Sequence, residues 1–261
     1  MDLGIAGRWG IVCASSQGLG RACAEALAEE GVNLVVNGRD EEKLEKAAAG
    51  IRALPGIERE VIAVAADITT ASGRDVLLSA CPEPDILVTN NRGPKPGILA
   101  DQTLESFEEA LTLHFRTPLA LLMAVLPGMK ARGWGRIVCI TSAMVTAPEE
   151  VQIASASARA AQTAMMKAAS FDAAAHGVTI NFLQPRGIES QRQRDVVAHE
   201  AEVRGVSFDE AWARQVSSVA AKRFGTPTEF GKTCAFVCSA HAGYMSGTNL
   251  HLEGGTYTGI T

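Results

Sequence analysis

The stretch from Trp9 to Gly20 joins a short apolar run to a glycine-bearing turn, and a helical pattern follows at once. The run is Trp9-Gly-Ile-Val-Cys13 and the turn is Ala14-Ser-Ser-Gln-Gly-Leu-Gly20. Gly18 and Gly20 allow a ligand to approach the backbone closely. The free N–H groups and the positive end of the following helix favour a diphosphate. Two spaced glycines are a weak signal, so this prediction of a dinucleotide site depends on the rest of the chain.

The same alternation of apolar runs and helical patterns continues along the chain. The runs are rich in Val and Ile and are apolar almost throughout, which is typical of parallel strands covered on both faces. The sequence therefore predicts an α/β fold: a single dinucleotide-binding domain over residues 1–261, with one Rossmann-type, doubly wound parallel sheet flanked by helices. After the first run, the expected strands are 32–36, 61–65, 86–89, 136–140, 178–182 and 249–252.

Composition excludes several classes of function. The net charge is −5 and no basic stripe with interleaved aromatic residues occurs, which argues against a nucleic-acid partner. No stretch approaches the roughly 20 apolar residues of a membrane span, and the chain does not begin like a secreted precursor, so we expect a cytoplasmic protein without a membrane partner. The six cysteines are scattered and lack partners at metal-ligand spacing, which predicts buried thiols and no metal site.

Arg39 follows the second expected strand, where a dinucleotide site contacts the adenosine ribose. An acidic residue there would bond the two free hydroxyls of NAD, whereas an arginine pairs with the 2′-phosphate of NADP. Arg39 thus predicts NADP(H) as the cofactor. The alternative is a surface arginine that binds no ligand.

Further motifs stand at the ends of the later strands and towards the carboxyl terminus. They are Asp67, Asn90-Asn-Arg-Gly93, Ser142, Pro185, Arg223-Phe-Gly-Thr-Pro-Thr-Glu229 and Leu252-Glu-Gly-Gly255. In order and spacing, these motifs and the glycine turn resemble the short-chain dehydrogenase/reductase family, and in particular its 3-oxoacyl-ACP reductases, over essentially the whole chain. The resemblance implies an oxidoreductase that transfers a hydride between NADP(H) and a small carbonyl or alcohol substrate, and it implies a homodimer or homotetramer.

The resemblance also implies which residues bind the cofactor, with two departures from the family. Ala14 stands where the family has its first turn glycine, and Pro185-Arg-Gly187 replaces the family's Pro-Gly beside the nicotinamide amide. The cofactor-binding residues implied are Ala14, Ser16, Gln17, Gly18, Leu19, Gly20, Arg39, Asp67, Ile68, Asn90, Arg159, Pro185, Gly187, Ile188 and Ser190.

The catalytic pattern of the family is altered in this chain. The family uses a Ser, a Tyr, a Lys one helical turn after the Tyr, and an Asn on the preceding long helix. Aligning Ser142 with the Ser places Ser155 at the Tyr position, Arg159 at the Lys position and His114 at the Asn position. A serine hydroxyl is too short and too weak an acid to replace the phenol directly, and an arginine does not release a proton.

His114 is the candidate that replaces the missing phenol. An imidazole with an ordinary pKa of about 6.5 exchanges protons near neutrality, and the family's Asn at this position handles a water. We expect a relay from His114 through a water to the substrate oxygen, which Ser142 orients. The alternative is that His114 only bonds a backbone group in a long helix over 104–131, bent by Pro118. A non-redox lyase or isomerase and a catalytically silent NADP-binding sensor also stay open as functions.

Residues 190–222 are rich in charge and predict one or two helices, with Ser207-Phe-Asp-Glu210 as a capping box. The resemblance makes this segment a lid over the substrate. Arg92, Arg186, Arg192 and Arg194 are expected at the carboxyl ends of the strands, which is the basis for the hypothesis of an anionic substrate. Surface arginines without a ligand are the alternative.

Small residues over 154–164 predict that another helix packs closely on this part of the chain.

Overall fold

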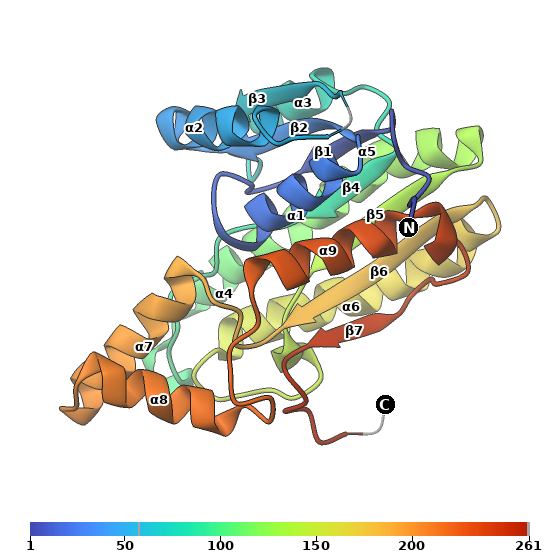
Figure 1. The fold of residues 1–261 in the computed structure, drawn as a ribbon. Coiled ribbons are helices and arrows are strands. Elements are labelled where there is room, and N and C mark those ends of the chain that lie inside the picture. The colour runs from blue at the N-terminus through green and yellow to red at the C-terminus, as the bar shows by residue number, and fades with distance from the viewer. Residues whose placement is uncertain (57, 260–261) are drawn as a thin grey trace.

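The computed structural model describes residues 1–56 and 58–259, and within these residues the chain forms one parallel sheet between two layers of helices (Figure 1). The strand order is β3-β2-β1-β4-β5-β6-β7, and every pair is parallel. The strands are β1 (Trp9–Val12), β2 (Asn33–Gly38), β3 (Val61–Ala65), β4 (Ile86–Thr89), β5 (Gly135–Ile140), β6 (Val178–Pro185) and β7 (Asn249–Leu252). The predicted doubly wound α/β fold is confirmed, and its order reverses between β1 and β4, where such sheets bind ligands.

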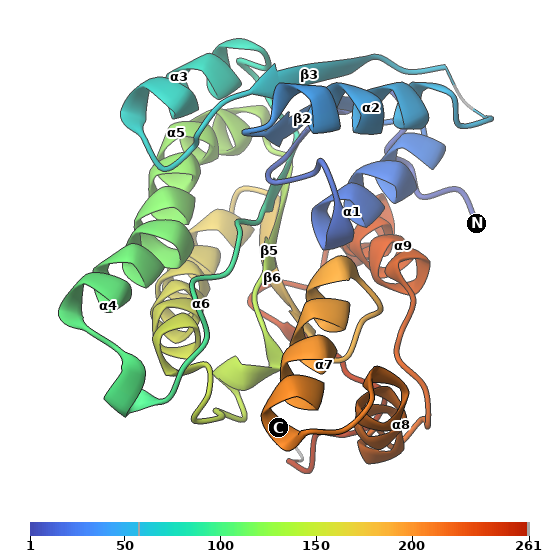
Figure 2. The ribbon, with the colours of Figure 1, turned by 90° about the vertical axis from the view of Figure 1, so that its left-hand side faces the viewer.

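Two helical layers cover the two faces of the sheet (Figure 2). Helices α1 (Gly18–Glu29), α2 (Glu41–Arg52) and α9 (Pro227–Cys238) pack on one face, and α3 (Ala71–Ser79), α5 (Thr117–Arg132) and α6 (Ile153–Ala174) on the other. The remaining helical elements are η1 (Leu99–Asp101), α4 (Leu104–Leu111), η2 (Thr112–Arg116), η3 (Ala143–Val145), α7 (Gln191–Arg204), α8 (Phe208–Ser218) and η4 (Ala240–Ala242).

Strands β2 and β6 run further than the apolar runs that predicted them. Each extension contains a buried polar side chain, Asn37 in β2 and Gln184 in β6. The amide of Asn37 donates to the carbonyls of Val64 and Ala66 at 3.0 and 3.1 Å, and Thr146 donates to Gln184 at 3.1 Å. Both buried side chains thus make hydrogen bonds, although the Nε2 of Gln184 has no partner among the described residues.

The predicted long helix exists, but its irregularity precedes Pro118. Helices α4 and α5 are joined by the π-helical turn η2, which contains His114. Proline has no N–H to offer the carbonyl four residues earlier, which is that of His114. The hydroxyl of Thr117 donates to the carbonyl of Thr112 at 2.7 Å. The helix therefore contains a wider turn directly before Pro118.

By length and composition, the continuous helix Leu104–Arg132 could cross a membrane, since one 18-residue window has a mean hydropathy of 1.4. The expectation that no stretch would approach a membrane span is wrong by this measure. Core helices of soluble proteins meet the same criterion, and Leu121, Leu122 and Val125 of α5 pack in the core beside the sheet. Length and composition are therefore weak evidence for a span.

All six cysteines are buried free thiols, as predicted. Cys234 and Cys238 of α9 lie in the same core cluster as Cys23 of α1. Burial raises the pKa of the Cys13 thiol to about 12, so this thiol stays protonated near neutrality.

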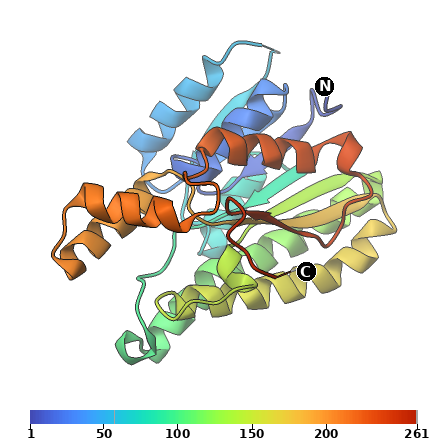
Figure 3. The same ribbon diagram turned by 60° about the horizontal axis from the view of Figure 1, so that its bottom comes forward.

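The lid segment contains the two predicted helices, and the capping box between Ser207 and Glu210 is present. Helices α7 and α8 lie side by side and follow the carboxyl end of β6 (Figure 3). The small residues of α6 do allow a close approach, but the partner is in the same chain: Ala154 and Ala158 pack on Ala110 of α4.

Gly231 of α9 packs closely on α1. A Cβ built on Gly231 would lie 2.2 Å from the carbonyl oxygen of Ala22, so Gly231→Ala forces the two helices apart. We expect a loss of about 1–3 kcal/mol in the free energy of unfolding, measured by urea denaturation. Gly50→Ala in α2 is the matched control. Its Cβ would meet only the flexible end of Arg21 at 3.3 Å, so it gains about 0.5–1 kcal/mol from helix propensity. Equal changes in the free energy of unfolding for Gly231→Ala and Gly50→Ala would refute the packing argument.

Candidate active site and cofactor cleft

The glycine turn brings the start of α1 against the end of β1. A Cβ on Gly20 would lie 2.3 Å from the carbonyl oxygen of Ala14, so only glycine fits. Gly18 has a φ of +60° and no atom near its Cβ direction. Ala14 has a φ of 47°, a left-handed conformation that costs an alanine about 1–2 kcal/mol. The turn therefore keeps its geometry even without the family's first glycine.

The first turn of α1 is open to an anion. Its N-cap residue Gln17 is exposed and makes no side-chain cap, whereas Asp40, Thr70 and Thr103 cap α2, α3 and α4. Uncapped N–H groups at the positive end of a helix are suited to bind phosphate oxygens. Leu19 turns the other way and packs against the core.

A buried network that the sequence did not reveal holds this turn in place. Ser15 donates its hydroxyl to the carbonyl of Val12 at 2.8 Å and accepts the N–H of Asn37 at 2.9 Å. Asn90, after β4, donates to the carbonyl of Ala14 at 3.4 Å. These contacts join the ends of β1, β2 and β4. The one signal in the sequence was the polar residue Asn37 at the end of an apolar run.

Arg39 and Ser16 form a corner at the end of β2. Arg39 is exposed and makes no ion pair with any residue that the structure describes. The hydroxyl of Ser16 lies 3.2 Å from the Cβ position of Gly38. A guanidinium without an ion pair to a described residue, at the same strand end as a hydroxyl, is suited to a phosphate monoester.

Asp67 lies beside this corner, with Ile68 buried next to it. Burial acts to raise the pKa of Asp67, but two hydrogen bonds from Thr69 and the charges of Arg39 and Arg92 leave it below its usual value. Asp67 is therefore a carboxylate at neutral pH, placed where the resemblance puts the adenine.

Backbone conformation and a backbone bridge hold the segment after β6 in place. Gly187 has a φ of +62°, and a Cβ there would lie 3.1 Å from Phe224. Ile188 forms a β-bridge with Gly225. Pro185 is the last residue of β6. The hydroxyl of Ser190, predicted to bind the cofactor, accepts the N–H of Gln193 as the N-cap of α7.

Arg159, which we predicted to donate to the nicotinamide ribose, makes three hydrogen bonds within the chain. Its Nη1 donates to the carbonyls of Ile140 and Thr141 at 2.7 and 2.8 Å, and its Nε to Ser155 at 3.3 Å. Only Nη2 makes no hydrogen bond to a described residue. Burial, helped by the charge of Arg192, lowers the pKa of Arg159 to about 10. It remains a cation and ties α6 to the end of β5.

Ser142 stands just beyond these carbonyls and accepts the N–H of Met144 at 3.2 Å. Its hydroxyl proton stays available to donate to a substrate oxygen.

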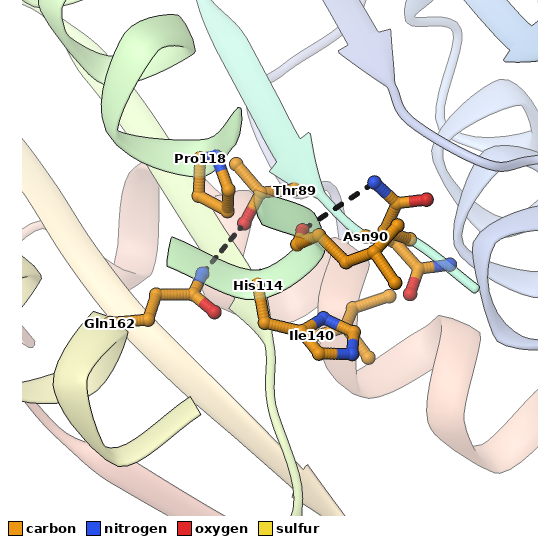
Figure 4. Close-up of a pocket in the computed structure, with 8 residues that line it drawn as sticks. Thr89, Asn90, His114, Pro118, Ile140 and Gln162 are labelled. Carbon is orange, nitrogen blue, oxygen red and sulfur yellow. Dashed lines mark hydrogen bonds between the residues drawn. The ribbon is translucent and has the colours of Figure 1, made fainter. Parts of the chain in front are cut away.

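His114 points from η2 into a small cavity (Figure 4). The side chain is 2% exposed, and its Nε2 has no hydrogen-bond partner among the residues that the structure describes. The space open to the centre of a water molecule is about 10 Å³, which is close to what one ordered water needs. The alternative that this nitrogen bonds a backbone group is not supported. The cavity is lined by Thr89, Asn90, Asn91, Leu113, His114, Pro118, Ile140 and Gln162.

The acid–base character of His114 differs from the expectation. Burial first, and then the positive charges of three nearby arginines, lower its pKa well below the ordinary value of 6.5; the arginines are Arg159, Arg192 and Arg92. The imidazole is therefore neutral near pH 7. It can pass a proton by donating at one nitrogen and accepting at the other, but it does not hold a stored proton.

His114 is not joined to the two serines by any hydrogen bond between described residues, and neither Ser142 nor Ser155 lines its cavity. The tyrosines stand elsewhere: Tyr244 is fully exposed, and Tyr257 stacks on His251 of β7. Among the described residues, no group of three or more His, Cys, Asp or Glu side chains could hold a metal ion.

Of the four arginines expected near the substrate, three have carboxylate partners. Arg92 pairs with Glu109, Arg186 with Glu149 at 2.6 Å, and Arg194 with Glu189 at 2.6 Å. Arg192 has none among the residues described.

Comparison with known proteins places this geometry among reductases. A family model described as enoyl-(acyl carrier protein) reductase matches residues 13–257. The NADPH-dependent reductase BacG of Bacillus subtilis is 26% identical over 97% of this chain and 99% of its own. The 3-oxoacyl-[acyl-carrier-protein] reductase FabG of Vibrio harveyi is 27% identical over 98% and 99%. The L-sorbose reductase of Gluconobacter frateurii, solved with NADPH and L-sorbose, superposes with a TM-score of 0.92 at 26% identity over both whole chains.

The neutral His114 makes stability depend on pH. The unfolded chain protonates this residue below about pH 6.5, whereas the folded chain resists protonation until its lower pKa, so acid favours unfolding. Protonation of His114 in the unfolded chain lowers the free energy of unfolding by up to about 1.4 kcal/mol per pH unit below about pH 6.5, and it has no effect above that pH. We expect His114→Asn to remove it. Urea denaturation at about pH 5 and about pH 7.5 measures the effect, with His176→Asn at an exposed site as the control. An unchanged acid sensitivity would contradict the assignment.

Proposed function

The chain belongs to the short-chain dehydrogenase/reductase family, and from this premise we propose that it is an NADP(H)-dependent oxidoreductase that interconverts a carbonyl and an alcohol. The observation that carries the proposal is the arrangement of residues at the ends of β1 and β2. The uncapped start of α1 lies over the end of β1, and Arg39, which has no ion pair with a described residue, follows the end of β2. BacG is described as NADPH-dependent, and the L-sorbose reductase was solved with NADPH, which supports NADP(H) as the cofactor here.

The residues present fit this dinucleotide. The N–H groups at Gly18 to Gly20 would hold the diphosphate, and Arg39 with Ser16 would hold the 2′-phosphate. Asp67 and Ile68 would flank the adenine, and Asn90 would lie on the nicotinamide side, beside the residues after β6. When bound, the cofactor supplies or accepts a hydride at the carbonyl carbon.

Arg39 is the residue by which the chain distinguishes the two cofactors. We expect Arg39→Ala to weaken NADPH binding about 10- to 100-fold, because one charge-assisted contact is lost, and to leave NADH binding nearly unchanged. Fluorescence titration with both cofactors measures this. Lys43→Ala removes a charge one helical turn away, where the ammonium pairs with Asp40 at 3.2 Å. If both variants weaken NADPH binding equally, Arg39 has no specific role.

The proton for the substrate oxygen comes, in our proposal, by way of His114. Ser142 donates its hydroxyl to that oxygen and orients it. The neutral imidazole passes a proton through an ordered water, because its unpartnered Nε2 faces a cavity of the size of one water. Arg159 supplies a fixed positive charge that favours the developing alkoxide.

Turnover of His114→Gln tests this relay. Gln is polar but cannot accept a proton at one atom and release another, so we expect kcat to fall about 100-fold while NADPH affinity is kept. The measurement is NADPH consumption with a panel of small ketones and oxo acids. His176→Gln is the matched control. A His114→Gln variant with the turnover of the parent chain would refute the relay.

A catalytically silent NADP sensor is the second candidate. It is favoured by the guanidinium of Arg159, which is bonded to Ile140, Thr141 and Ser155, and by the missing phenol at position 155. NADPH binding without turnover of any compound in the panel would favour this function, whereas substrate conversion without a change in nicotinamide absorbance would identify a lyase or isomerase.

We also propose that the protein acts in the cytoplasm as a homodimer or homotetramer. The buried free thiols suit a reducing compartment. On α6, Ala160, Ala164 and Phe171 are exposed on one side, and Met123 of α5 is 68% exposed, a surface that a second copy could cover.

A further inference from the structure

Arg192 is a cation for which the described part of the chain offers no counter-charge. It lies in the first turn of α7, is exposed, and makes no ion pair with the residues that the structure describes. Arg92, Arg186 and Arg194 come from the same region, and each has a carboxylate partner. The absence of a partner for Arg192 is therefore not a general property of this surface.

The guanidinium of Arg192 reaches across from the lid to the loop after β4. It packs so closely on Gly93 that a Cβ there would lie 2.5 Å from Nη1 and 2.7 Å from both Cζ and Nη2. The side chain thus has a defined position, made possible by the glycine, rather than extending into solvent. It joins the lid to the loop that also contributes Asn90 and Asn91 to the His114 cavity.

Arg192 lies close enough to the reacting groups to influence them. Burial is the main cause of the lowered pKa of Arg159 and of His114, and the positive charge of Arg192 lowers both pKa values further. Two guanidinium groups therefore act on one partly dehydrated region, and no carboxylate among the described residues pairs with either. The two positive charges repel each other in such a region, whereas both would attract a bound anion.

We propose that Arg192 binds a carboxylate of the substrate, so that the natural substrate is a small oxo acid or the corresponding hydroxy acid rather than a neutral ketone. The carboxylate would lie at Arg192 and the reacting carbonyl at Ser142. A planar guanidinium binds a carboxylate with two parallel hydrogen bonds, which fixes orientation as well as affinity. This inference rests on the proposed function, whose site it deepens.

The cofactor diphosphate is the other anion that could reach Arg192. The uncapped start of α1 already offers N–H groups to it, whereas the charge of Arg192 acts on His114 and Arg159. We therefore assign Arg192 to the substrate, and cofactor affinity separates the two cases.

The test compares oxo acids with their neutral methyl esters in the full-length protein. We expect kcat/KM for the acids to exceed that for the esters at least tenfold. Arg192→Gln should remove this preference by raising KM for the acids about 10- to 100-fold, with the NADPH dissociation constant unchanged. Arg194→Gln is the matched control, because that side chain lies two residues away on the same helix and pairs with Glu189. Equal rates for acids and esters, or an Arg192→Gln variant like its parent, would overturn the proposal.

Two further outcomes are distinguishable. If Arg192→Gln weakens NADPH binding by the same factor as it raises KM, then Arg192 binds the diphosphate and the assignment to substrate is wrong. If the protein binds NADPH but reduces nothing, calorimetric titration of the NADPH complex with the oxo acids decides. Saturable binding lost in Arg192→Gln supports the carboxylate site although the proposed reaction has failed, and no binding overturns the inference.

Discussion

The direct contact between Gly20 and the carbonyl of Ala14 is the constraint on which the rest of the site depends. It starts α1 at the end of β1 without a Cβ between them, so the uncapped N–H groups of the helix open onto the crevice where the strand order reverses. Ser15, Asn37 and Asn90 then bind neighbouring strand ends to this point. The corner of Arg39 and the loop before Gly93 take their positions from that frame.

Charge is the second organising property of the site. Arg159 is buried against the carbonyls that end β5, so its cation is fixed by hydrogen bonds and not by a counter-ion. Burial is the main reason that His114 stays neutral, and the charge of Arg159 adds to it. In the proposed mechanism, Ser155 and Arg159 replace the family's Tyr and Lys, so the site keeps a positive charge but has no phenol. The proposal therefore routes the proton through water and the imidazole.

The fold could be predicted from the sequence because each apolar run and each helical pattern agreed with the same architecture. Every strand appeared within a few residues of its expected position. The glycine turn could also be predicted, since the close approach at Gly20 requires a residue without a Cβ. Three features could not be predicted from the sequence. The hydrogen bonds of Arg159 depend on which carbonyls lie beside it in space, and the neutrality of His114 depends on burial and on distant charges. The lack of an ion pair at Arg192 among the described residues depends on which glutamates pair with the neighbouring arginines.

In an ordinary helix, the direction of the His114 side chain and the faces that the neighbouring turns present would be fixed together. The π-helical turn between α4 and α5 makes them independent. A wider turn of this kind takes up an extra residue locally, so the helices on either side keep the faces that they present to the sheet and to α6. Leu121 and Val125 pack in the core on one side of it, and Ala110 packs on α6 on the other. His114 lies within the turn itself. The direction of the imidazole can consequently change during evolution, by gain or loss of one residue here, without repacking of the protein around it.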